Sequence, residues 1–479
     1  MSEHLFISHF RQFMKKNRKR FVGILALILV LMGEEHALEW LLIDDDGTFE
    51  RIMMHDFYEN TENIDNLYVG SSHVFCDLNP AILDEINGKN NFNLSTSAQP
   101  LIASYYLLIE ADKRNDLTCV YLDLWNGLLM EDNGKWKEPG ELLTSWQVLD
   151  QMKFSENKLK WMLDSTDYRH VYLSMFPSIR YKNRLLDSDY LAEQLHNKTN
   201  SDYLCYDDLE SYVRKGYSYT EHKAEELYCT TSVRTVESPR ELSETAKEYL
   251  IKIIDYCDKN NIKLRLCANP VSDWELCQTG DYDNYVMQMK NLVSQYGLEY
   301  YDFNLCRKEY LDIGDNIYWS DNNHLNKYGA ELYSNVFGIF FEKLDKGEIQ
   351  GSDYFYDSYQ EKLDDMEERV FGVVVEEIND ERKAEYFASF SIEPMDAYRL
   401  FHLSTVGNLK SDSVETYVYR VETGSKDKIL LQEWDRNNRY ILPVDAEGGK
   451  LYIKVRNSRT KEEYGEVVIE YKGDSGNIS

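Results

Sequence analysis

The chain has no Cys-x-x-Cys pair, although it contains eight cysteines among its 479 residues. Metal sites built on cysteine need such spacings, so the usual metal motifs are absent, and we expect no metal and no other cofactor. Cys119, Cys257 and Cys267 lie in apolar patterns that are typical of buried thiols. Cys205 and Cys229 lie in a loop-rich stretch, where the sequence leaves a disulfide between them open.

Positive charge is also scarce in this sequence. Lys and Arg number 53 against 84 Asp and Glu, which gives a formal net charge of -31. A field of that sign repels nucleic acid and anionic lipid, so a nucleic-acid partner is excluded. The chain is otherwise globular in composition, with 43% hydrophobic and 29% charged residues, and it is long enough for two or three domains.

A long uninterrupted apolar run is missing from the N-terminus. The run Phe21–Gly33 is too short to cross about 30 Å of hydrocarbon, and a longer span would have to continue to Ile43. That continuation contains four charged or titratable residues: Glu34, Glu35, His36 and Glu39. Charges inside a span are costly, whereas a cleaved signal peptide would need a small-residue cleavage site that the sequence lacks. A buried core helix is the remaining alternative.

The charges on either side of the apolar run favour a membrane anchor. Five basic residues precede it: Lys15, Lys16, Arg18, Lys19 and Arg20. Asp44–Asp46 follow it, and basic-before, acidic-after flanks are typical of an N-inside orientation. We therefore predict a cytoplasmic basic segment and a single membrane anchor over residues 1–46, with the rest of the chain outside the cytoplasm.

Short apolar segments alternate with helix-like segments over residues 47–346. The expected strands are Leu67–Val69, Asn91–Leu94, Thr118–Leu124, Lys263–Ala268 and Leu298–Phe303. The expected helices are Pro80–Ile86, Leu101–Lys113, Arg240–Asn260, Tyr285–Tyr296 and Lys327–Leu344. This alternation predicts an α/β fold, a doubly wound parallel sheet in a three-layer α/β/α arrangement. Residues 132–237 do not follow this alternation, and we interpret them as an insertion that forms a cap or cleft wall.

The character of the sequence changes after residue 346. Residues 347–370 form a polar, helix-like connector, and residues 371–472 contain short, mostly alternating strand-like segments separated by turn residues. That pattern predicts an all-β sandwich as an accessory domain. Trp434 lies beside a charged turn and is the aromatic residue there that we most expect to be exposed. Residues 473–479 look like a disordered tail.

Two segments carry the candidate chemistry. In "NLYVGSSHVFCDLNP" a buried strand ends at Gly70, and Ser71 and Ser72 follow it before a helix. In "IYWSDNNHLNKYGAEL" Asp321 and His324 precede another helix, at a spacing that lets both face one cleft. A nucleophilic serine needs an imidazole to accept its proton and a carboxylate to orient that imidazole. In a parallel sheet both segments lie beyond the carboxyl ends of strands, and so on one face.

These segments resemble two blocks of the SGNH/GDSL hydrolase family. Gly70–His73 is similar to the first block, with Ser71 in the place of the aspartate and Ser72 in that of the nucleophile. "SDNNHLNKYGA" is similar to the last block, in which Asp-x-x-His precedes a helix, and the resemblance extends over residues 64–344. It implies a catalytic set of Ser72, Asp321 and His324, with His73 as a turn residue or cleft wall.

The other two blocks depart from the family pattern. The second block supplies a glycine whose N–H binds the oxyanion, and here Ser95 stands in its place, with Gln99 as a further donor. The third block supplies an asparagine, for which Asn126 is the candidate in a different setting. Asp123, at the end of the third expected strand, is another polar candidate. The expected oxyanion set is therefore Ser72, Ser95, Gln99 and Asn126.

Within the family, the Gly-Ser-Ser form and the expected anchor resemble the bacterial alginate-acetylation and teichoic-acid D-alanylation type. The resemblance implies an extracytoplasmic serine enzyme that handles O-acyl groups on a cell-surface or exported polysaccharide. An acylated glycan would be its substrate and a membrane-bound O-acyltransferase its partner. Two alternatives stay open: a carbohydrate esterase with the same triad, and a catalytically degenerate module that binds glycan or a partner.

Overall fold

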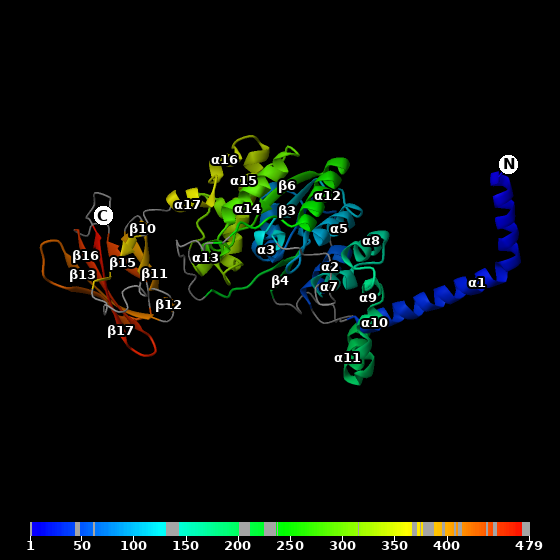
Figure 1. Cartoon of the computed structure of the whole chain (residues 1–479), viewed down its shortest axis with the longest axis horizontal. Coiled ribbons are helices and arrows are strands. Elements are labelled where there is room, and N and C mark those ends of the chain that lie inside the picture. The colour runs from blue at the N-terminus through cyan, green and yellow to red at the C-terminus, as the bar shows by residue number, and fades with distance from the viewer. Residues whose placement is uncertain are drawn as a thin grey trace.

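The computed structural model describes the chain in segments: residues 2–43, 48–60, 63–130, 143–200, 211–224, 236, 238–314, 316–365, 371–373, 375–376, 388–394, 398–406, 409–410, 414–436, 439–443 and 448–471. These residues form an α/β domain and a C-terminal β domain, preceded by a long N-terminal helix (Figure 1). The expected disordered tail and the pair Cys205 and Cys229 lie outside the described residues.

A five-stranded parallel sheet organises the α/β domain, as predicted. Its order is β2-β1-β3-β6-β7. The strands are β1 (Asn66–Val69), β2 (Asn91–Asn93), β3 (Cys119–Asp123), β6 (Lys263–Ala268) and β7 (Tyr300–Asp302). Each falls within or beside the segment expected from the sequence, and every neighbouring pair is parallel.

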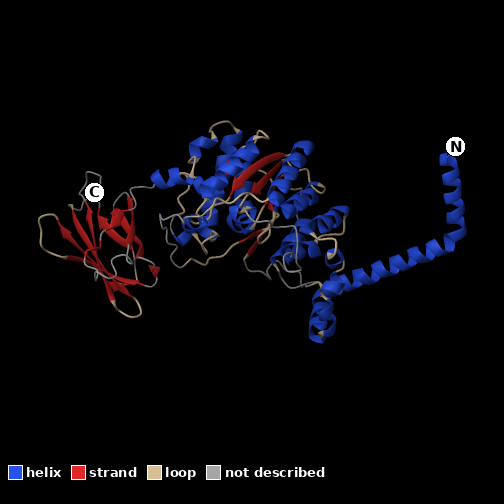
Figure 2. Ribbon diagram, viewed as in Figure 1, coloured by secondary structure: helices blue, strands red, loops and turns tan. Residues whose placement is uncertain are grey.

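Alternating side chains of the inner strands enter two separate cores. Leu67 and Val69 of β1 pack into one core, whereas Tyr68 packs into the other, where its ring stacks on Tyr121 of β3. Since side chains of a strand alternate between its two faces, the sheet needs apolar cover on both sides. Helices supply that cover on each face (Figure 2).

The helices of the α/β domain match the expected segments closely. They are α4 (Pro80–Asn87), α5 (Leu101–Asp112), α12 (Glu244–Asn260), α14 (Tyr282–Ser294) and α15 (Lys327–Asp345). Helix α12 begins four residues later than expected because the Ser243 side chain accepts a hydrogen bond from the Ala246 N–H. Shorter helices are α2 (Phe49–His55), α3 (Ser72–Asp77), α6 (Asn126–Leu129) and α13 (Asp273–Thr279), and a π-helix spans Asp56–Asn60.

The described part of the insertion is mainly helical. It contains α7 (Leu143–Gln151), α8 (Glu156–Ser165), α9 (Val171–Met175), α10 (Pro177–Arg180) and α11 (Ser188–Thr199), then β4 (Tyr212–Arg214) and β5 (Tyr217–Ser218). The β4–β5 turn packs on the sheet edge, where the Asn93 N–H donates to the Lys215 carbonyl at 2.9 Å. Gly216 permits this approach, since a Cβ there would lie 1.8 Å from the Asn93 carbonyl oxygen.

The N-terminal segment is a single helix, α1 (Ser2–Leu42). In the part of the chain that the structure describes, no helix combines the length and apolarity needed to cross a membrane, so the predicted transmembrane anchor is wrong. The acidic residues that follow the apolar run lie on this helix, and two of them contact side chains of other helices. Ser178 of α10 donates to Glu35 at 2.5 Å, and Lys158 of α8 lies 3.7 Å from Glu39. The predicted location outside the cytoplasm depended on that anchor and stays a prediction.

The C-terminal region is all-β, as its alternating pattern predicted. The strands are β8 (Phe371–Val373), β9 (Val375–Glu376), β10 (Ala388–Pro394), β11 (Tyr398–Val406), β12 (Leu409–Lys410), β13 (Val414–Glu422), β14 (Ile429–Asp435), β15 (Arg439–Pro443), β16 (Gly449–Asn457) and β17 (Glu463–Tyr471). They form two antiparallel sheets, one ordered β12-β11-β10-β8 with β15 beside β11, the other β14-β13-β16-β17-β9.

The segment expected as a connector packs on the α/β domain. It forms the short helices α16 (Gly351–Tyr354) and α17 (Tyr359–Asp365). Tyr356, Tyr359 and Leu363 are buried in the same core as α14. Lys362 donates to the Asp273 carboxylate and to the Asn304 carbonyl, each at 2.9 Å. Residues up to Leu363 therefore belong structurally to the α/β domain.

This packing predicts different outcomes for two truncations. A chain that ends after residue 370 should keep the thermal unfolding midpoint of the α/β domain, because its core is intact. A chain that ends after Gln350 should lose more than about 3 kcal/mol of stability, since it removes several buried aromatic side chains. Circular dichroism melting of both chains measures this. Aggregation of the longer chain would mean that the β domain supports the α/β core.

Candidate active site

The turn after β1 positions Ser72 at the carboxyl edge of the sheet. Gly70 adopts a φ of +158°, and a Cβ on it would lie 2.5 Å from Cβ of Asp123 on the neighbouring strand. Only glycine allows so close an approach of the two strand ends. Ser72 then begins α3, so the backbone there is helical and not extended. The N–H of a residue in a first helical turn has no partner within its own helix.

A tight loop before α15 holds the other two candidate residues. Trp319 and Leu325 form an isolated antiparallel bridge, and the Ser320 N–H donates to the His324 carbonyl at 2.9 Å. The helix is capped by Asn326, whose side chain accepts from two backbone N–H groups of the first turn. Asp321 is therefore not used as the helix cap and is available to the imidazole.

The structure brings the three candidate residues together. His324 Nε2 lies 2.7 Å from Ser72 Oγ, and His324 Nδ1 lies 3.0 Å from each carboxylate oxygen of Asp321. The arrangement assigns the Nδ1–H tautomer to His324, with Nε2 free to accept the serine proton. Such a relation of nucleophile, base and orienting carboxylate is the geometry that activates serine hydroxyls.

The carboxylate of Asp321 is held in its ionised form. Partial burial opposes ionisation, but hydrogen bonds from the His324 ring and from the Asn323 and His324 N–H groups outweigh it and lower the pKa of Asp321 to about 2. A carboxylate that stays charged can stabilise an imidazolium on His324. The side chain of His324 is 27% exposed, so solvent and substrate reach the base.

A second, buried hydrogen-bonded group lies behind the triad. Ser71 Oγ is 2.9 Å from His73 Nδ1 and 3.3 Å from Asp123 Oδ2. The single hydroxyl proton of Ser71 can point to only one of these neighbours. When Asp123 is ionised, Ser71 donates to it and accepts from His73. When Asp123 is protonated, the carboxyl group donates to Ser71, and Ser71 donates to His73.

His73 packs directly on His324 without replacing it as the candidate base. Its ring lies 5.1 Å from the His324 ring at an interplanar angle of 21°, and it also contacts Trp125 edge-on at 4.8 Å. Burial, followed by the nearby His324 charge, lowers the pKa of His73 to about 3, so the ring is neutral. A neutral ring adds no charge beside the imidazolium that catalysis would form on His324.

Asn269, directly after β6, joins these strand ends and was not anticipated from the sequence. Its side chain donates to the His73 carbonyl at 2.9 Å and accepts from the Tyr333 hydroxyl at 2.7 Å. Its N–H donates to Asp123 Oδ1 at 2.9 Å. Its position in the sequence could have indicated this role, since a polar residue at the carboxyl end of a parallel strand lies at the same edge of the sheet as Ser72.

The expected oxyanion residues are only partly available. The Gln99 amide donates to Ser104 Oγ at 2.9 Å and accepts from Thr96, and Asn126 Nδ2 lies 3.4 Å from Thr279 Oγ1. Ser95 is fully buried, and its hydroxyl has no hydrogen-bond partner among the described residues. The backbone N–H groups of Ser72 and Ser95 remain the predicted donors, whereas the side chains of Gln99 and Asn126 point to structural partners.

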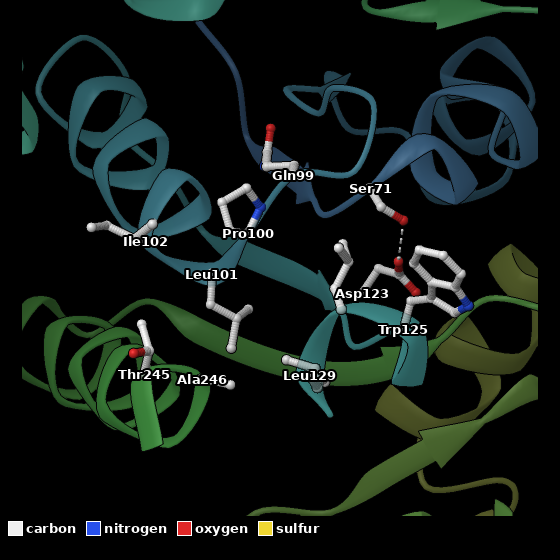
Figure 3. A pocket seen from close by; sticks show the side chains of 11 residues that line it. Ser71, Gln99, Pro100, Leu101, Ile102, Asp123, Trp125, Leu129, Thr245 and Ala246 are labelled. Atoms are coloured by element: carbon white, nitrogen blue, oxygen red, sulfur yellow. Dashed lines mark hydrogen bonds between the residues drawn. The ribbon is translucent and has the colours of Figure 1, made fainter. Parts of the chain in front are cut away.

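A small, largely apolar pocket opens beside this polar group (Figure 3). Ser71, Asp123 and Trp125 lie on one side of it in the view, and Leu101 and Ile102 line it from α5. In the described residues, no cluster of three or more His, Cys, Asp or Glu side chains is arranged to hold a metal ion. The lining of this pocket includes Ser71 and Asp123 but none of Ser72, Asp321 and His324.

Comparison with known proteins adds little to this site. No family model matches the chain, and no curated protein matches it. A solved structure of a protein from Streptococcus pneumonia, proposed to be a platelet activating factor, aligns with a TM-score of 0.28 and 12% identity, covering 66% of this chain and 98% of that one. A TM-score this far below 0.5 is evidence for neither a shared fold nor a shared activity.

The buried carboxyl group of Asp123 predicts a pH-dependent stability. Burial raises the pKa of Asp123 to about 7, although hydrogen bonds from Asn269 and Ser71 oppose the shift. The unfolded chain loses this proton near pH 4, so between about pH 4 and 7 the folded state holds more protons, and stability falls as the pH rises. Asp123→Asn should remove on the order of 4 kcal/mol of that fall.

Chemical denaturation of the wild-type chain and the variant at several pH values measures the difference. Asp116→Asn, at an exposed aspartate in the loop before β3, is the matched control and should leave the pH profile unchanged. Part of the slope should survive in Asp123→Asn, because burial also raises the pKa of Asp302 to about 6. Equal slopes for wild type and Asp123→Asn would show that the Asp123 carboxyl is not protonated in the folded state at pH 6.

Proposed function

We propose that the chain is an SGNH-like serine enzyme that transfers acyl groups from O-acyl esters. The observation that carries the proposal is the hydrogen bond of 2.7 Å between Ser72 Oγ and His324 Nε2, with Asp321 bound to the opposite ring nitrogen. A plain turn and a surface histidine would have no reason to meet across 252 positions in the sequence. The same meeting argues against a catalytically degenerate module.

The proposed reaction proceeds in two acyl-transfer steps. Ser72 Oγ attacks the ester carbonyl while His324 Nε2 takes the hydroxyl proton, and collapse of the tetrahedral intermediate passes that proton to the leaving alkoxide. An acceptor hydroxyl then attacks the acyl-serine, with His324 again taking and returning a proton. The N–H groups of Ser72 and Ser95 are the proposed oxyanion donors, and each such donor typically contributes about 10²–10³ in rate.

Water and a sugar hydroxyl are both chemically competent acceptors at this site. Asp321 is 53% exposed and His324 is 27% exposed at the side chain, so water has access to the acyl-serine. Hydrolysis is therefore the baseline activity that we propose, and transfer to a glycan hydroxyl requires that an acceptor sugar be held in place of water. The O-acylated polysaccharide substrate and the membrane-bound O-acyltransferase partner stay predictions from the resemblance.

The test compares two adjacent serines. Ser72→Ala and His324→Ala should each lower turnover of an aryl acetate by about 10³-fold or more, and Ser72→Ala should also abolish labelling by a serine-directed fluorophosphonate. Ser71→Ala is the matched control and should keep the label, because its hydroxyl is bound to His73 and Asp123. If labelling survived in Ser72→Ala but was lost in Ser71→Ala, Ser71 would be the nucleophile and our assignment of Ser72 would be wrong. Absence of label and turnover in wild type would contradict the proposal.

A further inference from the structure

The ring of His73 has one nitrogen that no described residue satisfies. His73 is 1% exposed, and its Nδ1 lies 2.9 Å from Ser71 Oγ. Its Nε2 is buried as well and has no hydrogen-bond partner among the residues that the structure describes. A buried polar atom without a partner is costly, so the groups around Nε2 decide whether a proton there is favourable.

The backbone of Asn323 is the hydrogen-bonding group that acts on this ring. Burial lowers the pKa of His73, and hydrogen bonding to the Asn323 backbone is among the effects that oppose this shift. Since Nδ1 faces Ser71, Nε2 is the nitrogen left for the Asn323 carbonyl, although the contact falls short of full hydrogen-bond geometry. Asn323 lies between Asp321 and His324, and its N–H donates to the Asp321 carboxylate at 2.7 Å. A proton on His73 Nε2 therefore acts on the loop that carries the candidate base.

The tautomer of His73 depends on Asp123 through the Ser71 hydroxyl. Ser71 points at Asp123 Oδ2 (Figure 3), while the Asn269 N–H holds Oδ1 at 2.9 Å. With Asp123 protonated, Ser71 donates to His73 Nδ1 and the ring proton lies on Nε2, toward Asn323. With Asp123 ionised, His73 donates from Nδ1 and Nε2 presents a lone pair. Between these states one proton leaves from Nε2, the Asp123 proton passes to Ser71, and the Ser71 proton passes to Nδ1.

We propose that His73 is a positioning residue for the candidate base, and that Asp123 controls its tautomer through Ser71. The tautomer with a proton on Nε2 donates to the Asn323 carbonyl and fixes the loop behind His324. The other tautomer places a lone pair against that carbonyl and loosens the loop, while the stacking of the two imidazole rings at 5.1 Å stays. The inference rests on the proposed function, because only a working base has a rate that its position can change.

Other titratable groups also face this array, and one of them needs a control of its own. Asp302, at the end of β7, titrates in a similar range, since burial raises its pKa to about 6, and its charge is one of the smaller effects that raise the pKa of Asp123. Burial raises the pKa of each of the remaining neighbours of Asp123, which are Asp77 of α3, Cys267 of β6, Tyr285 of α14 and Tyr333 of α15. Asp321 and His324 are the titratable groups that face His73.

Histidine ring NMR tests the tautomer without any substrate. The full chain is labelled with 15N-histidine, and the His73 signals are assigned by their loss in His73→Phe. We expect the ring proton on Nε2 at about pH 5 and on Nδ1 at about pH 8.5. Asp123→Asn should keep it on Nε2 throughout, because the amide donates to Ser71 as the protonated carboxyl does. Asp302→Asn is the control and should keep the change, with its midpoint at lower pH. The same wild-type tautomer at both pH values would overturn the inference.

Turnover of an aryl acetate tests the positioning role. The wild-type rate should fall by up to about tenfold as Asp123 ionises, which corresponds to the loss of one hydrogen bond. Asp123→Asn should remove this fall. His73→Phe should be about tenfold slower than wild type at acidic pH and should show no fall, whereas His73→Gln, whose amide can donate to the Asn323 carbonyl, should recover part of the rate. Circular dichroism checks that each variant is folded.

The two measurements separate failure of this inference from failure of the proposed function. Turnover with an unchanged His73 tautomer, or a fall in rate that persists in Asp123→Asn, would overturn the inference and leave the proposed function intact. Absence of turnover in wild type would contradict the proposed function, and the positioning role with it.

Discussion

The close approach of β1 and β3 at their carboxyl ends is the constraint on which the site depends. Gly70 lets the backbone after β1 contact the Asp123 side chain of β3, and this places Ser71 inside and Ser72 at the surface. From there the contacts extend outward. Asp77, on the helix that Ser72 begins, accepts the Leu325 N–H at 3.0 Å and fixes the loop that carries His324. A short strand end thus determines where the nucleophile meets its base.

This arrangement buries carboxyl groups, which disfavours their ionised form. Asp77 and Asp123 are almost inaccessible to solvent, and burial raises the pKa of each, so both favour the protonated state far more than exposed aspartates do. Asp321 differs in kind, since it is partly exposed and is held ionised by hydrogen bonds. The site therefore contains buried carboxyl groups whose pKa is raised and one charged carboxylate that faces the imidazole. Environment, and not residue type, separates these roles.

Local patterns were sufficient to predict the strands, the main helices and the three residues that meet. Short apolar runs, the strand–turn–helix setting of Ser72 and the Asp321–His324 spacing are all properties of contiguous sequence. Asn269 and the contact of His73 with His324 depend on which strand lies beside which, and no local pattern encodes that order. The anchor prediction failed because Glu34, Glu35 and Glu39 interrupt the continuation of the apolar run to Ile43, and the charges that flank the run do not offset them. The packing of the expected connector on the α/β domain was not predicted, because its few buried aromatic residues, such as Tyr359, lie among many charged ones.

The aromatic residues of the two domains meet different demands, which explains why composition alone was ambiguous. In the α/β domain, Tyr68 and Tyr121 are buried between the sheet and α15, where their stacked rings take the place of aliphatic side chains. In the β domain, the inner faces of β13 and β16 are filled by Val, Ile and Leu side chains, such as Val418 and Ile453. On the opposite face Tyr419 is also buried, where its ring stacks on Tyr452 at 4.8 Å and its hydroxyl donates to Glu466 at 2.8 Å. Aromatic rings therefore replace aliphatic packing inside the α/β domain, whereas in the β domain they cover the outer face of β13 and β16, whose inner face is aliphatic.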